Sequence, residues 1–204
     1  MTILLVDDHA LVRAGLKRLL ATLGDGDILE AANGRDALAL LRAAKPDLVI
    51  LDLNLPGLGG LELLRRMVHD GAARILVLSM HAEPLYARRA LEAGAAGYVT
   101  KNASPDELLT AVRRVTAGGR YVEAELAQAL AAPNSGGGQP LDNLTARELE
   151  IMRLLAKGGS LAEIAGALGV GYKTVANNAS QIKSKLGVSR TADLVRLAIE
   201  TGVS

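Results

Sequence analysis

Five polar residues in the first half of the chain directly follow short, almost wholly apolar runs. Each brings a carboxylate, a hydroxyl or an ammonium group to the end of its run: Asp7, Asp8, Asp52, Ser79 and Lys101. Carboxylates suit a hard cation such as Mg²⁺, whereas a hydroxyl and an ammonium group can bind the oxygens of a phosphoryl group. Together these residue types suit phosphoryl chemistry, provided that the fold brings them to one place.

The surrounding sequence predicts the elements that would position these residues. Apolar runs of this length, alternating with helical stretches, are typical of parallel strands covered on both faces. We expect strands near 3–7, 27–31, 47–52, 74–79 and 97–100, and helices near 10–22, 34–44, 59–69, 84–93 and 105–117. The last helix has a clear start, with Ser104 as N-cap, Pro105 as first helical residue and Glu107 completing a capping box. The predicted fold is an α/β domain with a doubly wound, five-stranded parallel sheet, whose ligands bind beyond the carboxyl ends of the strands.

The three carboxylates would meet at that edge and repel one another. At an effective dielectric of ~20, each close pair of like charges costs several kcal/mol. Such a cluster is stable only if a cation joins it or if some of the acids are protonated. Mg²⁺ is the natural candidate, since it takes carboxylate oxygens while sharing itself with phosphate. Lys101 supplies a compact positive charge for Asp52 or for a phosphate oxygen, and Ser79 can donate a hydrogen bond to a phosphoryl oxygen.

These residues resemble the receiver domain of two-component response regulators. The resemblance covers residues 1–120 and is carried by Ile3-Leu4-Leu5-Val6-Asp7-Asp8-His9, Asp52-Leu53-Asn54-Leu55-Pro56-Gly57 with Gly60, Leu78-Ser79 and Tyr98-Val99-Thr100-Lys101. It implies the strand order 2-1-3-4-5, with Asp52 accepting a phosphoryl group from a sensor histidine kinase or a small acyl phosphate. It also implies Mg²⁺ held by Asp8, Asp52 and the backbone carbonyl of Asn54, with Asp7 helping through water. Ser79, Tyr98 and Lys101 would form a switch in which the hydroxyl turns to the phosphate and the ring moves inward.

Several nearby positions qualify this resemblance. Asn102 follows the lysine where many receivers have Pro, so the conformation of the Lys101–Asn102 peptide bond stays open. His81 and Asn54 occupy positions where the family tunes the rate of dephosphorylation, although an exposed loop residue is the alternative for His81. We interpret His9 and His69 as structural because neither has the spacing of a metal ligand.

Composition and linkers indicate two folded units. We expect a receiver at 1–120, a linker at 121–142 with an Ala-rich helix and then a Gly/Pro-rich segment from Pro133 to Pro140, and a second domain at 143–204.

The composition excludes some classes of site. The chain has no Cys, which excludes disulfides and thiolate sites, and its net charge of +1 does not by itself favour any class of partner. Without a signal peptide or an apolar segment of membrane-spanning length, a cytoplasmic protein is expected.

The second domain is predicted to be all helical. Capping boxes at Thr145 to Glu148 and at Ser160 to Glu163 open helices that run to about Lys157 and Leu168. A Gly-containing turn then leads into a longer helix at 172–186, and a last helix covers about 191–200. Two helices joined by a short Gly-containing turn are typical of a helix-turn-helix.

The helix at 172–186 separates an apolar face from a polar one. Its apolar positions recur at helical spacing and would pack on the core: Val175, Ala179, Ile182 and Leu186. Its other face offers side chains that suit bases or phosphates in DNA: Lys173, Thr174, Asn177, Asn178, Gln181 and Lys183. A solvated polar face is the alternative.

This domain resembles the LuxR-type DNA-binding domain. The resemblance covers residues 143–200 and is carried by Leu144-Thr145-Ala146-Arg147-Glu148-Leu149-Glu150, Glu163-Ile164-Ala165, Lys173-Thr174-Val175 and Lys185-Leu186-Gly187-Val188. With a receiver, it implies a transcription regulator of the NarL/FixJ class that binds promoter DNA as a dimer. The chain departs from the usual pattern where Ala176, Asn178 and the pair Leu161-Ala162 replace basic or polar residues.

The sequence therefore predicts a phosphorylation-controlled transcription regulator that forms a homodimer when phosphorylated and is not an enzyme beyond self-dephosphorylation. One alternative is a regulator that acts on other proteins and has weakened or lost DNA binding. A second alternative, an aspartyl-phosphate phosphatase, requires a second acid two residues after the nucleophile, where this chain has Asn54.

Overall fold

The computed structural model describes residues 1–24, 26–55, 59–72, 74–131, 141, 144–201 and 203. The chain divides into two compact units, Met1–Ala132 and Pro133–Ser204. The predicted Gly/Pro-rich linker lies outside the described residues, as do Pro56 and Gly57 of the receiver motif. The predicted domain boundaries therefore stay a prediction.

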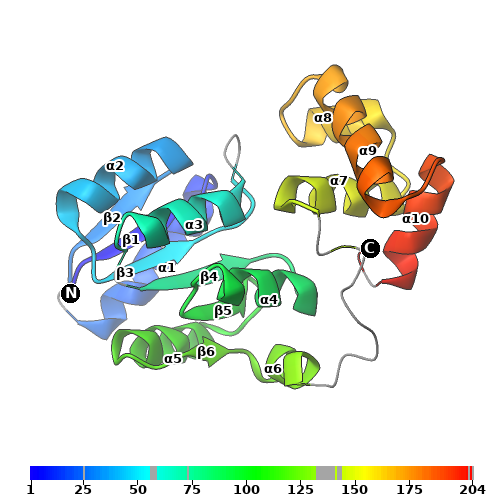
Figure 1. Cartoon of the computed structure of the whole chain (residues 1–204). Coiled ribbons are helices and arrows are strands. Elements are labelled where there is room, and N and C mark those ends of the chain that lie inside the picture. The colour runs from blue at the N-terminus through cyan, green and yellow to red at the C-terminus, as the bar shows by residue number, and fades with distance from the viewer. Residues whose placement is uncertain are drawn as a thin grey trace. The chain divides into compact units, whose positions relative to one another are not determined.

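The first unit is built on one parallel sheet (Figure 1). Its strands are β1 (Ile3–Val6), β2 (Ile28–Ala31), β3 (Leu48–Leu51), β4 (Ile75–Ser79), β5 (Gly97–Thr100) and β6 (Tyr121–Val122). The order β2-β1-β3-β4-β5-β6 confirms the predicted arrangement of the first five strands and adds a sixth at the edge. We did not predict β6, because two residues carry no alternation that a sequence pattern could reveal.

Helices cover both faces of this sheet. They are α1 (Ala10–Leu20), α2 (Gly34–Ala44), α3 (Gly60–His69), α4 (Pro84–Glu92) and α5 (Pro105–Thr116), with a short 3₁₀ turn (Ala21–Leu23) after α1 and α6 (Ala124–Ala131) after β6. Leu5, Leu76 and Val99 share one apolar cluster with Leu20 of α1 and Val112 of α5. Hence α1 and α5 cover one face of the sheet, and α2, α3 and α4 lie on the other (Figure 1).

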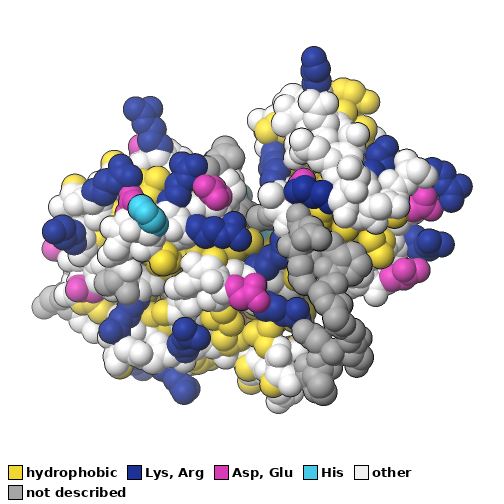
Figure 2. All heavy atoms as spheres, in the orientation of Figure 1, with side chains coloured by type: hydrophobic (Ala, Val, Ile, Leu, Met, Phe, Trp, Pro, Cys, Tyr) yellow, Lys and Arg dark blue, Asp and Glu magenta, His cyan; other side chains and the backbone are white. Residues whose placement is uncertain are grey.

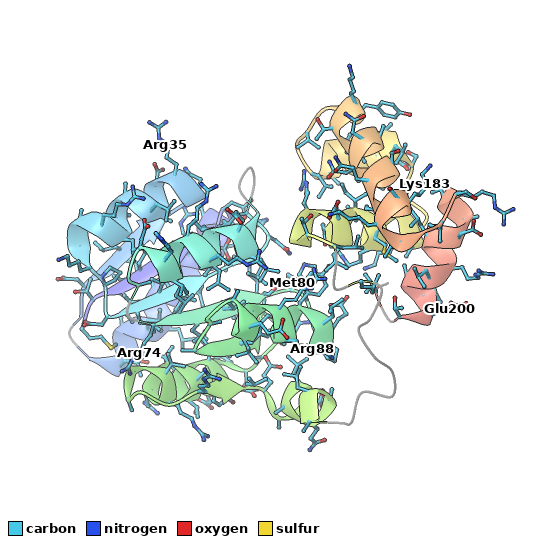
Figure 3. All side chains as sticks on the ribbon, in the orientation of Figure 1. Arg35, Arg74, Met80, Arg88, Lys183 and Glu200 are labelled. Carbon is cyan, nitrogen blue, oxygen red and sulfur yellow. The ribbon has the colours of Figure 1, made fainter. Side chains whose placement is uncertain are left out.

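The ends of α5 are held by polar contacts. The Ser104 side chain accepts a hydrogen bond from the Glu107 backbone N–H over 3.2 Å, as predicted. The predicted capping box is otherwise wrong, since the Glu107 carboxylate accepts from the Tyr121 hydroxyl over 3.0 Å. Arg74, labelled in Figure 3, donates to the carbonyls of Val115 and Thr116 at the other end of α5. Side chains from β6 and from the residue before β4 therefore form hydrogen bonds with the two ends of this helix.

The second unit contains four helices in its described part. These are α7 (Ala146–Ala156), α8 (Leu161–Ala167), α9 (Tyr172–Leu186) and α10 (Thr191–Glu200). Both predicted capping boxes are present, with Thr145 and Glu148 opening α7 and Ser160 and Glu163 opening α8. The predicted helix-turn-helix is thus formed by α8 and α9.

Glu148 links the start of α7 to the end of α9. Its buried carboxylate accepts from the Thr145 backbone N–H and from Lys185 Nζ, each over 2.7 Å. Burial alone would raise the pKa of Glu148, but the hydrogen bonds from Lys185 and Thr145 outweigh burial and lower it. At a pH above the ordinary pKa range of a carboxyl group, the ionised Glu148 therefore stabilises the fold. This contribution is lost as the pH falls through the lowered pKa of Glu148.

Replacing Glu148 with Gln is expected to reduce the stability of the second unit by about 2–3 kcal/mol, because Lys185 loses the charge of a buried partner. Native-state hydrogen exchange of the α7 and α9 amides would measure the loss. The matched control is Glu200→Gln, where an exposed carboxylate lies 3.7 Å from Arg196 and the expected loss is below about 0.5 kcal/mol. Equal losses in both variants would contradict the prediction.

Candidate phosphoryl and DNA-binding sites

The predicted carboxylates and the lysine meet at one edge of the sheet. Lys101 Nζ lies 2.6 Å from Asp7 Oδ2 and 2.7 Å from Asp52 Oδ2. Asp7 and Asp52 are each 2 % exposed, whereas Asp8 is exposed to solvent. Because β1, β3 and β5 are parallel and end together, Lys101 reaches Asp7 across 94 positions of the chain and Asp52 across 49.

The charges of this cluster are partly balanced. Burial raises the pKa of Asp52, although the hydrogen bonds from the Asn54 backbone N–H and from Lys101 oppose that effect. Burial would lower the pKa of Lys101, but its hydrogen bonds to Asp52 and Asp7 raise it instead. One cation thus faces two buried carboxylates, which leaves net negative charge for a further cation to neutralise.

The donor set fits a hard divalent cation. One ligand atom from each of Asp7, Asp8, His9 and Asp52 lies within 4.8 Å of the others. His9 Nδ1 lies 2.7 Å from Asp8 Oδ1, and the His9 backbone N–H donates to Asp7 Oδ1 over 2.8 Å. The interpretation of His9 as a structural residue without the spacing of a metal ligand is therefore wrong in part, since its ring nitrogen lies among the carboxylate oxygens that could hold an ion. Carboxylate oxygens together with the Asn54 backbone carbonyl are ligands that Mg²⁺ prefers.

The predicted switch residues lie beside the carboxylates. The fully buried Ser79 hydroxyl accepts from the His81 backbone N–H over 3.2 Å. The Tyr98 ring is fully buried in this structure, and its hydroxyl donates to the His81 carbonyl over 2.7 Å. Burial raises the pKa of Tyr98 well above its ordinary value, so the phenol stays protonated and can donate. The peptide bond between Lys101 and Asn102, left open by the sequence, is trans.

His81 is not an exposed loop residue, so that alternative is wrong. Its side chain is 4 % exposed and stacks on the Tyr86 ring, with centroids 4.0 Å apart. His81 Nε2 lies 2.8 Å from Asn54 Oδ1. Two residues that are 27 positions apart in the sequence therefore touch each other, and the Asn54 backbone N–H also donates to Asp52 Oδ1 over 3.0 Å.

The predicted DNA contacts lie along α9. Lys173, Thr174, Asn177 and Gln181 are exposed, whereas Asn178 and Lys183 (labelled in Figure 3) are half-buried. The Asn178 amide donates to the Thr174 carbonyl over 2.8 Å, so a contact from Asn178 to a base would have to replace that bond. The opposite face buries Val175, Ala179 and Ile182, as predicted, while Leu186 is half-buried.

Positive charge is thinly spread over the second unit. On its visible face, Figure 2 shows Lys and Arg side chains scattered among uncharged ones rather than gathered in one patch. Lys185, at the end of α9, is bound to Glu148. Among the described residues, no helix has both the length and the apolar character that crossing a bilayer requires.

Both units match known protein families. Residues 3–113 match the response regulator receiver domain, and residues 142–198 match the bacterial regulatory proteins of the luxR family. The chain is 46 % identical to the transcriptional activator protein ExaE of Pseudomonas putida, covering 100 % of this chain and 98 % of ExaE. It is 37 % identical to the response regulator UvrY of Escherichia coli K12, covering 100 % of this chain and 95 % of UvrY. The crystal structure of the response regulator ChrA, from a heme-sensing two-component system, is 32 % identical and superposes with a TM-score of 0.54 over 100 % of this chain and 98 % of ChrA.

Proposed function

Because this chain belongs to the response regulators of the NarL/FixJ class, transcription regulators that join a receiver domain to a LuxR-type DNA-binding domain, we propose that phosphorylation of Asp52 controls it. The observation that supports this proposal is the shared contact of Lys101 with Asp7 and Asp52. This contact places the Lys101 ammonium group beside the buried Asp52 carboxylate, where it can bind an oxygen of an added phosphoryl group. A sensor histidine kinase is the proposed donor, and a small acyl phosphate is a second one.

Each residue of the site has a proposed part in the transfer. An oxygen of Asp52 forms the new bond to phosphorus while the bond to the donor's imidazole or carboxylate breaks. Asp8, Asp52 and the Asn54 carbonyl would hold Mg²⁺, with Asp7 acting through water, and the ion supplies charge neutralisation when bound. Lys101 and the Ser79 hydroxyl then bind phosphoryl oxygens, as an ammonium and a hydroxyl donor can.

The output of the proposed site is a change in assembly and DNA binding. Ser79, Tyr98 and Lys101 report the phosphoryl group to the surface around α4, β5 and α5, which favours a homodimer. The dimer binds promoter DNA in the cytoplasm through Lys173, Thr174, Asn177, Gln181 and Lys183, with Asn178 joining once its bond to Thr174 is replaced. The chain acts as a phosphoryl acceptor rather than an enzyme, with at most the loss of its own phosphoryl group.

Sedimentation velocity tests this proposal. Beryllium fluoride with Mg²⁺ imitates a phosphoryl group on Asp52, and we expect it to convert monomer into dimer. The expected increase in association is within the roughly 5–150-fold range typical of coupled sites. An identical sedimentation profile with and without beryllium fluoride, in a sample shown by ¹⁹F NMR to hold it, would reject dimerisation as the output.

A second candidate function is regulation through protein contacts with weakened DNA binding. The engaged Asn178 side chain and the scattered cations of the second unit favour it. A beryllium fluoride-dependent dimer that retains no fragment from a pool of bacterial genomic DNA would support this second candidate over the first.

A further inference from the structure

The chain that leaves the receiver is attached to the sheet next to the phosphoryl site. β6 pairs with β5 so that Tyr121 lies opposite Gly97 and Val122 opposite Tyr98. A Cβ atom on Gly97 would lie 2.7 Å from the Tyr121 carbonyl oxygen, so this close pairing requires glycine. The predicted linker is therefore not a free tether at its start, because its first two residues are part of the sheet.

Glu123 continues this attachment with its side chain. Its carboxylate accepts hydrogen bonds from the backbone N–H and from the hydroxyl of Thr100. Thr100 directly precedes Lys101, whose Nζ binds Asp52 over 2.7 Å. The Glu123 carbonyl accepts from the Ala127 backbone N–H over 2.8 Å, in the first turn of α6. One residue thus joins the end of β5 to the start of the helix that leads out of the receiver.

We propose that Glu123 is a positioning residue that couples Asp52 to α6: its bonds to Thr100 hold α6 on the sheet at rest, and phosphorylation of Asp52 releases them. The inference rests on the function proposed above. Lys101 follows the phosphoryl oxygens when they arrive, and the backbone carries that shift to the Thr100 N–H. The new negative charge acts in the same direction, since it repels the Glu123 carboxylate.

Two further observations support this coupling. Besides burial, the charges of Glu83, Glu123 and Asp52 raise the pKa of Tyr98, so the fields of Glu123 and Asp52 both reach that hydroxyl. Leu126 is the one buried side chain of α6, so apart from its contacts with α4 the helix has little apolar packing to hold it once the Glu123 bonds open.

The structure also leaves room for the movement. A hollow of about 560 Å³ lies between α6 and the turn that follows β5. Pro84, Asn102, Ser104, Glu123 and Ala129 are among the residues that line it. The turn after Lys101 can therefore shift without displacing tightly packed side chains, which a dense core would not allow.

Hydrogen exchange of the full-length protein tests the coupling. Amide exchange of Thr100 and of α6 would be measured by NMR with and without beryllium fluoride and Mg²⁺, and ¹⁹F NMR would report whether beryllium fluoride is bound. In the wild type we expect beryllium fluoride to speed exchange of these amides about tenfold or more. In Glu123→Ala the fast exchange should already be present at rest, with less than about a twofold further increase.

Two variants control this experiment. Glu125→Ala removes an exposed carboxylate from the same helix, at the same hollow, and should behave as the wild type. Glu123→Gln should keep slow exchange at rest, because its amide oxygen can still accept from Thr100. Bound beryllium fluoride with unchanged exchange in the wild type, or slow resting exchange in Glu123→Ala, would overturn the coupling alone. Absence of bound beryllium fluoride in the wild type would overturn the proposed function, and the coupling with it.

Discussion

Replacing Asp52 with Asn is expected to abolish phosphoryl uptake and every response to beryllium fluoride while the protein stays folded. An amide does not attack phosphorus, and Lys101 keeps its 2.6 Å contact with Asp7. Burial already raises the pKa of Asp52, so removal of this charge relieves the folded state rather than straining it. Intact-mass measurement after incubation with acetyl phosphate and Mg²⁺ would report the uptake, and thermal unfolding would report the fold.

The control for this variant makes the same chemical change elsewhere. Asp70→Asn removes a carboxylate that binds Arg42 over 2.6 Å, outside the proposed site, and should keep uptake and dimerisation. Uptake by Asp52→Asn at the wild-type rate would show that another side chain, such as Asp7 or Asp8, is the acceptor.

Most of the receiver architecture was predictable because burial leaves a simple signal. Four-residue strands such as β1 and β3 are buried at every position, so each appears in the sequence as an unbroken apolar run. The parallel order then places the residue after each run at one edge, which is why the sequence alone groups Asp7, Asp52 and Lys101. The strand ends were less predictable: the predicted strands at 3–7 and 47–52 included Asp7 and Asp52, which follow the observed strands.

The features that escaped prediction depend on contacts between distant residues. His81 is buried because Tyr86 stacks on it and Asn54 meets its ring, and neither partner is implied by the sequence around His81. Glu107 completes no capping box because Tyr121 of β6 binds its carboxylate instead. The role of Glu123 depends on the same unpredicted strand. Each case is a tertiary contact that overrides a local pattern.

The second unit shows the same division between local patterns and distant contacts. In the second unit, the capping boxes of α7 and α8 and the apolar spacing of α9 are local, and all of them are present in the structure. The contact that joins α7 to α9, between Glu148 and Lys185, is not local and was not predicted. Local sequence patterns thus predict the helices, whereas buried polar contacts such as that between Glu148 and Lys185 determine how the helices pack together.

Replacing Lys101 with Met is expected to destabilise the receiver by about 3–5 kcal/mol in EDTA at neutral pH, because two buried carboxylates lose their shared cation. The Lys101 side chain is 11 % exposed, so solvent replaces little of the lost interaction. Mg²⁺ should restore much of the loss, since a ligand at about 100 times its dissociation constant contributes about 2.7 kcal/mol. Urea unfolding in EDTA and in Mg²⁺, followed by circular dichroism, would measure both effects.

The pH dependence of this variant has a definite sign. Burial raises the pKa of Asp52 and Lys101 opposes that effect, so the pKa rises further when Lys101 is removed. When a carboxyl group has a higher pKa in the folded than in the unfolded state, it costs no stability at a pH below its unfolded-state pKa. The loss of stability grows as the pH rises from there through its folded-state pKa. The stability deficit of Lys101→Met should therefore shrink in acid.

The matched control is Lys17→Met. The Lys17 ammonium group pairs with Glu30 over 2.9 Å at the surface, so this substitution should change stability by less than about 1 kcal/mol. If Mg²⁺ stabilised Lys101→Met no more than Lys17→Met, or if the deficit of Lys101→Met grew in acid, Lys101 would not be the group that neutralises the buried carboxylates.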